Sequence, residues 1–252
     1  MSKIMAHRGA RNLWAENSAH GFRQTVAHGF DAIEFDVHLT DADELVVIHD
    51  ATLDRTTDGT GPVRHLTPES RKTLRLRGPD GALIAEGVPS LAEVLDILAP
   101  HPVDLYVELK SDETGRPYPG MVAKIADILR ARGLQSRSVL HSFDIAVVRE
   151  IREMAPEFGC LISVNREWAE RQGGIGAFLS DVEGLVDVVG IHHELYEAEF
   201  ELIERLRPIG ATSVWTVNDS DLIRRWIARG PGFVVSDNPV LVRELMNEDC
   251  PA

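Results

Sequence analysis

Residues 32–50 read AIEFDVHLTDADELVVIHD and carry the signal that decides the fold. The first six, 32–37, have strand length and alternate between two kinds of side chain. Successive side chains of a strand point to opposite faces, so Glu34 and Asp36 share one face and the apolar residues share the other. The pattern predicts a strand that packs on helices through its apolar face and presents two carboxylates on the opposite face.

The second half of this stretch predicts a hairpin. Residues 44–49 have strand character, and only the turn residues 40–43 separate them from the strand that ends near Leu39. A parallel crossover needs about a dozen residues or more, so a link this short has to be antiparallel. The hairpin would bring His49 beside the two carboxylates, in a register that the sequence leaves open.

The same alternation of strand and helix signals extends along the whole chain, which is typical of parallel βα units. The predicted strands are 3–8, 32–37, 104–110, 138–143, 159–164, 187–193, 213–218 and 232–237. The predicted helices, placed by their capping residues and breakers, are 18–28, 90–99, 120–132, 144 to the residue before Pro156, 198–207, 219–229 and 239–247. Eight units favour a closed TIM-type (β/α)8 barrel forming a single domain over residues 1–252; a doubly wound open sheet is the alternative.

Residues 51–89 interrupt the alternation. The segment is too long for an ordinary βα loop, is rich in Gly, Pro and polar residues, and has one short helix signal at Thr67-Pro68-Glu69. Long loops at the mouth of a barrel often cover an active site. The segment is therefore predicted to be a small capping insertion after the hairpin.

Composition limits the cellular setting and the partners. Cys160 and Cys250 are far apart in sequence and give no basis for a disulfide framework. The chain has no long apolar run, so we expect a cytoplasmic protein without stable membrane association. Its net charge of -14 disfavours nucleic acid, because nucleic acids bind clustered Lys and Arg. Oligomeric state cannot be inferred from these features.

A third carboxylate joins the first two on the inner face of the barrel. In residues 104–110 the same parity directs Glu108 and Lys110 inward. Three carboxylates in a poorly solvated mouth raise one another's pKa unless a cation compensates them. Oxygen ligands without a nearby cysteine favour one Mg²⁺ or Ca²⁺ ion. The alternative is a solvated pair formed by Glu34 and Asp36 at a strand end.

Two histidines are candidates for proton transfer. His7 ends the first predicted strand and is followed by Arg8 and Gly9, while His49 ends the hairpin. A lone histidine is more often structural, but a second histidine, an arginine and the carboxylates favour acid–base chemistry next to a phosphate. Lys110 could contact that phosphate or form an ion pair with Glu108. The remaining histidines considered are assigned to surface or packing positions: His38, His65, His101, His141, His192 and His193.

These residues belong to a series of short motifs along nearly the whole chain: His7-Arg8-Gly9, Glu16-Asn17-Ser18, Glu34-x-Asp36-Val37, Val47-Ile48-His49-Asp50, Arg55-Thr56-Thr57, Glu108-Leu109-Lys110, Trp215-Thr216-Val217-Asn218 and Ser236-Asp237-Asn238-Pro239. In this order, the series resembles the glycerophosphodiester phosphodiesterase family.

The resemblance implies hydrolysis of glycerophosphodiesters to glycerol 3-phosphate and an alcohol on a TIM barrel. It also implies roles for individual residues: Glu34, Asp36 and Glu108 would hold the divalent metal, His7 and His49 would be general acid and base, Arg8 and Lys110 would contact phosphate, and Trp215 would line the substrate pocket. It leaves open which histidine is the acid and whether water or the glycerol hydroxyl attacks first. The alternative functions are a phospholipase D-like enzyme acting on lysophospholipids, a noncatalytic ligand-binding barrel and, less favoured, a metal-dependent aldolase or isomerase.

Overall fold

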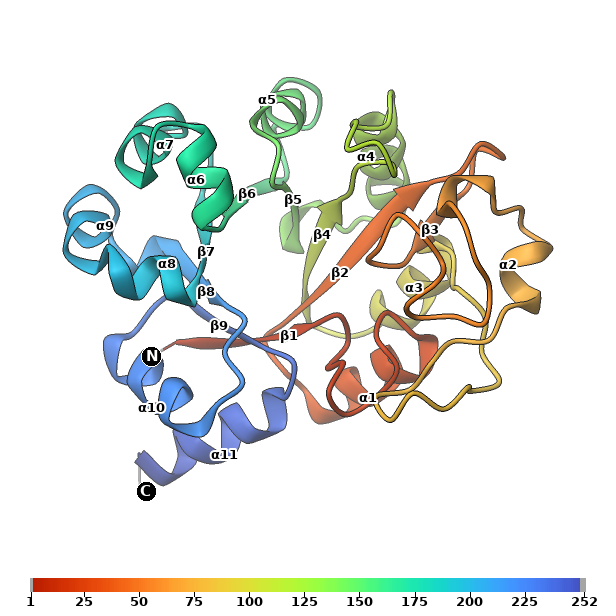
Figure 1. The fold of residues 1–252 in the computed structure, drawn as a ribbon, viewed down its shortest axis with the longest axis horizontal. Helices are drawn as coiled ribbons and strands as arrows, with labels where there is room; N and C mark the ends of the chain where they lie inside the picture. Colours follow the sequence, from red (N-terminus) through yellow and green to blue (C-terminus); the bar gives the residue numbers. More distant parts are fainter. Residues whose placement is uncertain (1, 250–252) are drawn as a thin grey trace.

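The computed structural model describes residues 2–249, and within them eight parallel strands close into a barrel. In chain order they are β1 (Lys3–His7), β2 (Ala32–Leu39), β4 (Asp104–Leu109), β5 (Ser138–Ser142), β6 (Gly159–Val164), β7 (Val188–His192), β8 (Thr212–Trp215) and β9 (Phe233–Ser236). Each strand pairs with the next, and β1 pairs with both β2 and β9. The closure confirms the predicted barrel and excludes the open sheet (Figure 1).

Helices surround the strands on the outside of the barrel (Figure 1). They are α1 (Ala19–His28), α3 (Leu91–Leu98), α4 (Met121–Ala131), α5 (Ile145–Met154), α6 (Arg166–Arg171), α7 (Ile175–Asp181), α8 (His193–Ala198), α9 (Phe200–Leu206), α10 (Ser220–Arg229) and α11 (Pro239–Asp249). Polar side chains cap several of them as predicted: Ser18 accepts a hydrogen bond from the Gly21 amide, and Ser90 forms a capping box with Glu93. The short helices α6, α7 and α8 were not predicted, because six or seven residues contain too little periodicity.

The predicted hairpin is present. Strand β3 (Leu45–Val47) runs antiparallel to β2, with Val37 opposite Val47 and Leu39 opposite Leu45. At the turn, the Asp43 amide donates to the Thr40 carbonyl over 3.0 Å. The strand is shorter than the predicted range 44–49, so His49 lies just beyond the ladder.

Side-chain parity divides the barrel into two apolar layers. The outward residues of β2 and β4 belong to the large core between strands and helices: Ile33, Phe35, Val37, Leu105, Val107 and Leu109. A second cluster of inward residues fills the barrel interior and includes Met5, Ala32, Tyr106, Leu161, Phe233 and Val235. Burial of each large apolar side chain stabilises the fold by about 1.5–3 kcal/mol. The interior cluster forms an apolar floor below the polar side chains at the carboxyl ends of the strands.

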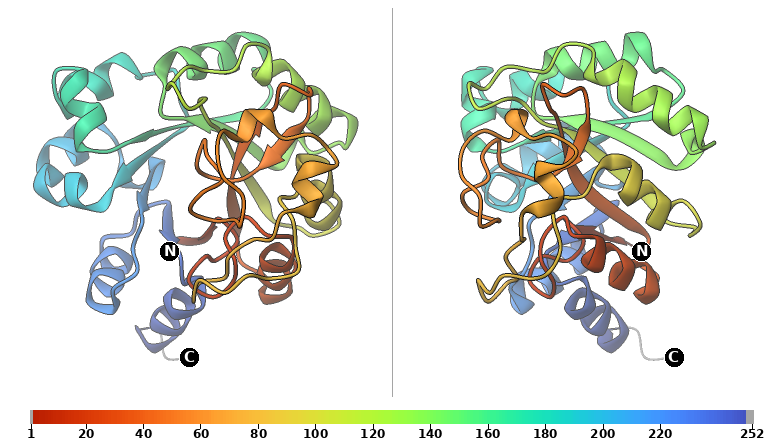
Figure 2. Two further views of the ribbon diagram at one scale, coloured as in Figure 1. Left: turned by 45° about the vertical axis from the view of Figure 1, so that its right-hand side comes forward. Right: turned by 90° about the vertical axis from the view of Figure 1, so that its right-hand side faces the viewer.

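The segment 51–89, orange to yellow in Figure 2, packs beside the hairpin and has an apolar core of its own. It contains a 3-10 turn, η1 (Val63–His65), and one helical turn, α2 (Ser70–Thr73). Apolar residues of the segment contact Val46 and Ile48 of the hairpin side: Leu53, Val63, Leu66, Leu76 and Val88. Arg71, only 4% exposed, forms ion pairs with Glu44 and Glu93. The segment is therefore packed against the barrel.

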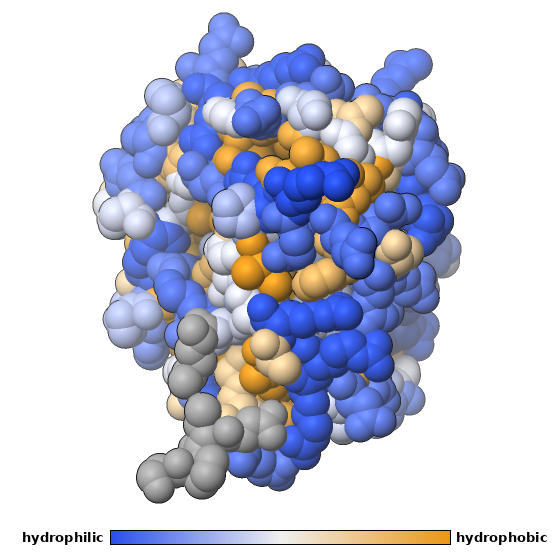
Figure 3. All heavy atoms as spheres, turned by 90° about the vertical axis from the view of Figure 1, so that its left-hand side faces the viewer, coloured by the Kyte–Doolittle hydropathy of each residue, from blue (hydrophilic) through white to orange (hydrophobic). Residues whose placement is uncertain are grey.

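The surface agrees with the acidic, largely polar composition. Figure 3 shows a mostly hydrophilic face with hydrophobic patches between hydrophilic residues. Within residues 2–249 no helix is both long and apolar enough to cross a lipid bilayer. Cys160 is buried and has a free thiol, whereas Cys250 lies outside the described residues.

Candidate active site

Polar residues from neighbouring strands meet at the carboxyl end of the barrel, where they line a cavity of about 90 Å³. Strand register explains why these residues lie together. His7 of β1 lies opposite Glu34 of β2, and Asp36 of β2 lies opposite Glu108 of β4. Of the residues singled out from the sequence, His7, Arg8, Glu34, His49, Glu108 and Trp215 line this cavity. Asp36 and Lys110 lie next to them, so the structure brings all eight together.

The three carboxylates are buried, and burial and neighbouring charges shift their pKa values in different directions. Glu34 is 5% exposed, and burial together with the charges of Asp36 and Glu108 raises its pKa well above the usual value. Burial opposes ionisation of Asp36 too, but His49, Arg8 and Lys110 outweigh it and hold the pKa of Asp36 well below normal. The crowding of negative charge expected from the sequence is therefore present, and among the three carboxylates it is Glu34 whose ionisation is disfavoured.

Two cations are embedded among these carboxylates. Lys110 Nζ donates to Glu108 Oε1 over 2.7 Å and lies 3.5 Å from Asp36 Oδ1, which is the ion pair considered as an alternative role for this lysine. Arg8 Nε lies 3.4 Å from Asp36 Oδ2. Arg8 has a left-handed backbone (φ 52°), and its carbonyl accepts the Asn17 amide. The Arg8 turn is thus tied to Asn17, whose side chain donates to Asp36 over 2.9 Å.

An aspartate from the last strand end orients His7. Asp237 is fully buried, and its Oδ1 lies 2.5 Å from His7 Nδ1. Asn218 donates to the other carboxylate oxygen, Oδ2 of Asp237, over 2.8 Å, and Arg11 Nε lies 2.9 Å from that same Oδ2. Because Nδ1 is engaged, the other ring nitrogen of His7 faces the carboxylates, 3.8 Å from Glu34 Oε2. Burial, followed by the charge of Arg8, lowers the pKa of His7.

His49 has the same kind of partner, supplied by the next residue in the chain. Its Nδ1 lies 2.6 Å from Asp50 Oδ1. Arg55, from the segment 51–89, donates to Asp50 over 2.6 Å and to Glu16 over 2.7 Å. The His49 carbonyl lies 3.0 Å from Nε2 of His38, a buried packing residue as predicted. The capping segment therefore contributes directly to the site through Arg55.

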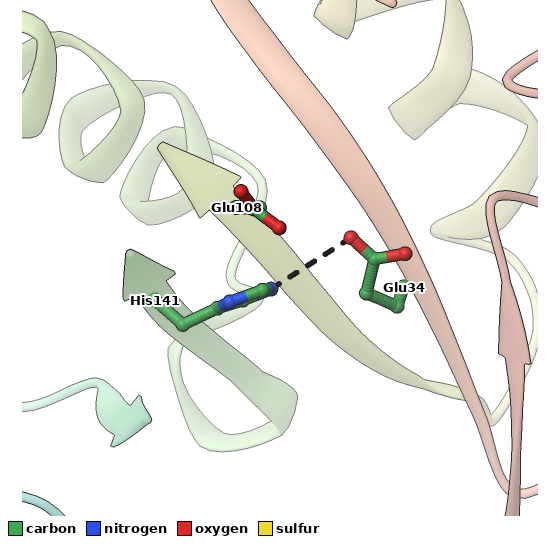
Figure 4. A group of neighbouring side chains, drawn as sticks. All are labelled: Glu34, Glu108 and His141. Carbon is green, nitrogen blue, oxygen red and sulfur yellow. Dashed lines mark ion pairs between the residues drawn. The ribbon is translucent and has the colours of Figure 1, made fainter. Parts of the chain in front are cut away.

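His141 belongs to this site, which corrects its assignment as an incidental surface or packing residue. It is 3% exposed, lines the cavity, and lies with Glu34 and Glu108 in a group whose potential ligand atoms are all within 4.8 Å of one another (Figure 4). The signal was available, because in residues 138–143 the parity that turns Val139 inward also turns His141 inward. Burial lowers the pKa of His141 and favours the neutral ring.

The donor set fits a divalent cation. Buried polar atoms without a hydrogen-bond partner among the described residues include Glu34 Oε1, Asp36 Oδ1 and both ring nitrogens of His141. Buried polar groups are normally paired, so a cluster of unpaired acceptors indicates a place for a positive ion. Carboxylate oxygen and imidazole nitrogen are both ligands of divalent metals.

Aromatic rings form one wall of the cavity. The Trp215 ring contacts Phe143 edge-on at 5.5 Å and His192 at 5.0 Å between centroids. Trp215 Nε1 is buried and has no hydrogen-bond partner among the described residues. The structure therefore places Trp215 at the cavity, with Phe143 and His192 as neighbours that the sequence did not single out.

Comparison with known proteins adds a family to this geometry. Residues 7–241 match the profile described as "Glycerophosphoryl diester phosphodiesterase family". A curated glycerophosphodiester phosphodiesterase of Caldanaerobacter subterraneus is 28% identical over 253 residues, covering 97% of this chain and 98% of the relative. A crystal structure of glycerophosphodiester phosphodiesterase from Agrobacterium tumefaciens is 29% identical with a TM-score of 0.75, covering 97% of this chain and 100% of that chain.

A more distant structure supports the fold alone. The Oleispira antarctica phosphodiesterase, solved in complex with the product sn-glycerol-3-phosphate, is 22% identical with a TM-score of 0.80. The match covers 98% of this chain and 97% of that chain.

Proposed function

The chain belongs to the glycerophosphoryl diester phosphodiesterase family, and from that premise we propose that it hydrolyses glycerophosphodiesters to glycerol 3-phosphate and an alcohol with two histidines and one divalent cation. The enzyme class follows from the family; the residue roles and the metal are our proposal. One observation carries it: His7 and His49, each paired with an aspartate, line the same cavity as Glu34 and Glu108.

We propose that the two histidines move the protons of the reaction. One imidazole takes a proton from the attacking oxygen as it bonds to phosphorus, and the other gives a proton to the alcohol oxygen as its bond to phosphorus breaks. Both rings have Nδ1 engaged by an aspartate, which fixes their orientation and leaves Nε2 for this transfer. The aspartates Asp237 and Asp50 act through the histidines.

We propose Glu34, Asp36 and Glu108 as the residues that hold the cation. Their burial supports this role, as do one oxygen of Glu34 and one of Asp36 that have no hydrogen-bond partner among the described residues. When bound there, Mg²⁺ or Ca²⁺ would supply positive charge to the phosphoryl oxygens. Without it, Glu34 is the carboxylate whose pKa is raised, first by burial and then by the charges of Asp36 and Glu108, so this side chain gains most from a nearby positive charge.

We propose that Arg8 and Lys110 stabilise the phosphoryl group and that Trp215 contacts the organic part of the substrate. Both cations lie within hydrogen-bond or ion-pair distance of the carboxylates, so their positions are fixed before substrate arrives. The sn-glycerol-3-phosphate bound by the Oleispira antarctica enzyme is the product that we propose here, and it supports a small-molecule substrate. A cytoplasmic location remains a prediction.

A phospholipase D-like function is disfavoured by the packing of the segment 51–89. A lipid substrate would need an exposed apolar entry surface, and the segment 51–89, which packs beside the site, offers only a few apolar residues spread among charges. Val63, Leu66, Leu76 and Val88 are instead buried in the segment's own core, and Leu83 alone among its leucines is as much as 36% exposed. The site fits a water-soluble diester better.

Assay of the phosphomonoester product tests the proposal, with and without chelator: glycerol 3-phosphate from a panel of glycerophosphodiesters, and lysophosphatidic acid from lysophospholipids. We expect turnover of glycerophosphodiesters that stops when divalent metal is removed and returns with Mg²⁺ or Ca²⁺. Full activity after complete metal removal would overturn the metal role. Turnover confined to lysophospholipids would overturn the proposed substrate class.

A further inference from the structure

We infer that His141 is a nitrogen ligand of the divalent cation, and that the site therefore favours a first-row transition-metal ion over Ca²⁺. The inference rests on the proposed function, because it concerns the same ion. It goes beyond the oxygen-only site expected from the sequence, and it follows from the position of His141, its unpaired nitrogens and its distance from Glu34.

Strand register fixes the position of His141. It lies on β5 directly opposite Glu108 of β4, as Glu108 lies opposite Asp36 of β2. The three side chains therefore occupy neighbouring positions around the inner wall, near the carboxyl ends of their strands. Figure 4 shows the His141 ring directed toward the carboxylates of Glu34 and Glu108.

The hydrogen bonding of His141 differs from that of the other histidines near the site. His7 and His49 each use Nδ1 on an aspartate, and His38 uses both ring nitrogens, one on Tyr118 and one on the His49 carbonyl. Neither nitrogen of His141 has a hydrogen-bond partner among the described residues. A buried ring with two unpaired nitrogens is unfavourable unless another group binds it.

Distances allow a shared ion with little movement. His141 Nε2 lies 3.8 Å from Glu34 Oε1, an oxygen that is also unpaired. Two ligand atoms that each lie about 2.1 Å from one ion can be up to about 4.2 Å apart. This pair is already inside that limit. The ligand atoms of Glu34, Glu108 and His141 together lie within 4.8 Å of one another, so binding one ion with all three needs a small side-chain movement.

The chemistry of the donor set gives the metal preference. Ca²⁺ and Mg²⁺ take oxygen ligands, whereas imidazole nitrogen binds first-row transition ions more strongly. A set with carboxylates and one neutral imidazole thus raises affinity for ions such as Co²⁺ or Zn²⁺ relative to Ca²⁺. Glu34 and Glu108 contribute to binding of either kind of ion, so only the nitrogen changes the ratio.

Calorimetric titration of the full chain with Co²⁺ and with Ca²⁺ tests the preference, using His141→Gln and, as a matched control, His65→Gln on a surface histidine that is 66% exposed. We expect the wild type and the control to bind Co²⁺ more tightly than Ca²⁺. His141→Gln should lower the Co²⁺-over-Ca²⁺ affinity ratio by at least about tenfold, the loss seen even when a partner of a metal ligand is removed. An unchanged ratio in a folded variant would overturn the inference.

A spectroscopic measurement on the wild type can overturn the inference even if the variant misfolds. With ¹⁵N-labelled histidine and bound Co²⁺, proton NMR should show a strongly shifted, solvent-exchangeable ring N–H signal, which His65→Gln keeps and His141→Gln loses. Tight Co²⁺ binding without such a signal would overturn His141 as a ligand and leave the proposed function standing. Absence of any divalent-ion binding, with hydrolysis that survives chelator, would overturn both.

Discussion

The site has two histidine–aspartate pairs, called here the first and the second arm, which make similar contacts but are built differently. In the first arm, His7 and Asp237 are separated by 230 positions in sequence and meet because β1 lies beside β9; their side chains are 11% and 0% exposed. In the second arm, His49 and Asp50 are adjacent in sequence, and both side chains are 28% exposed. The first arm is part of the barrel wall, and the second is a surface arrangement completed by the segment 51–89.

The difference shows that a histidine–aspartate contact matters more for folding when it is buried than when it is partly exposed. The Asp237 carboxylate is without solvent and depends on His7, Asn218 and Arg11 for its stabilisation. Water can replace part of the contact between His49 and Asp50, because both remain partly exposed. Damage to the first arm should therefore affect folding and rate together, while damage to the second should affect mainly rate.

The largest effects should come from removing either imidazole. We expect His7→Ala and His49→Ala each to lower kcat by about 10²–10⁴-fold, the range for a lost proton-transfer group, with little change in metal affinity. A nitrophenyl phosphodiester, whose leaving group needs no proton, should rescue only the variant that lost the acid. Steady-state kinetics on natural and activated substrates measure this. Equal failure on both substrates, with loss of metal binding, would show that these histidines are ligands or scaffold.

The aspartates test the comparison directly. Asp237→Asn should lower kcat by about 10²–10⁴-fold by disturbing the His7 tautomer. It should also lower the free energy of unfolding by about 1–3 kcal/mol, because its partners lose the buried negative charge that they contact. Asp50→Asn should reduce kcat less and leave urea unfolding nearly unchanged. The exposed Asp96→Asn, with a side chain that is 72% exposed, serves as control. Equal losses of stability at Asp237 and Asp50 would break the distinction between the two arms.

The carboxylates between the arms should affect metal binding more than folding. We expect Glu34→Gln, Asp36→Asn and Glu108→Gln each to weaken binding of the divalent cation by at least about tenfold. In chelator, the melting temperature of Glu34→Gln should hold or rise, since burial and the charges of Asp36 and Glu108 raise the pKa of Glu34. Asp36→Asn and Glu108→Gln should lower it, because neighbouring cations, Lys110 among them, hold the pKa of both carboxylates below normal. Calorimetric titration and thermal melting in chelator measure the two effects. Unchanged affinity in all three variants would return these residues to a structural role.

The smallest effect should come from Arg55, which supports the exposed arm. Its side chain is 45% exposed, so Arg55→Ala should lower the free energy of unfolding by less than about 1 kcal/mol. The difference from wild type should shrink further at about 1 M salt, because salt screens exposed ion pairs. Urea unfolding at low and high salt measures it. Arg64→Ala, which removes a similarly exposed pair with Asp41, is the matched control; a much larger loss for Arg55 would show that the exposed arm is also structural.

Local patterns in the sequence were sufficient for the barrel and for much of the site. Alternation with a period of two is a property of each strand alone, so it predicted the inward direction of Glu34, Asp36 and Glu108 before any neighbour was known. The short link at 40–43 likewise predicted the hairpin, because a link of so few residues can join two strands only in the antiparallel arrangement. The short helices α6 and α7 were missed for lack of periodicity.

Contacts between distant residues were decided only by tertiary structure. Asp237 reaches His7 because the last strand closes on the first, and His141 reaches Glu34 because the strands of the barrel are in one particular register. The direction of a side chain is set by its own backbone, whereas its partner depends on which strands pair and with what stagger. The sequence by itself therefore determined which face the reactive residues occupy, and barrel closure determined which of them touch.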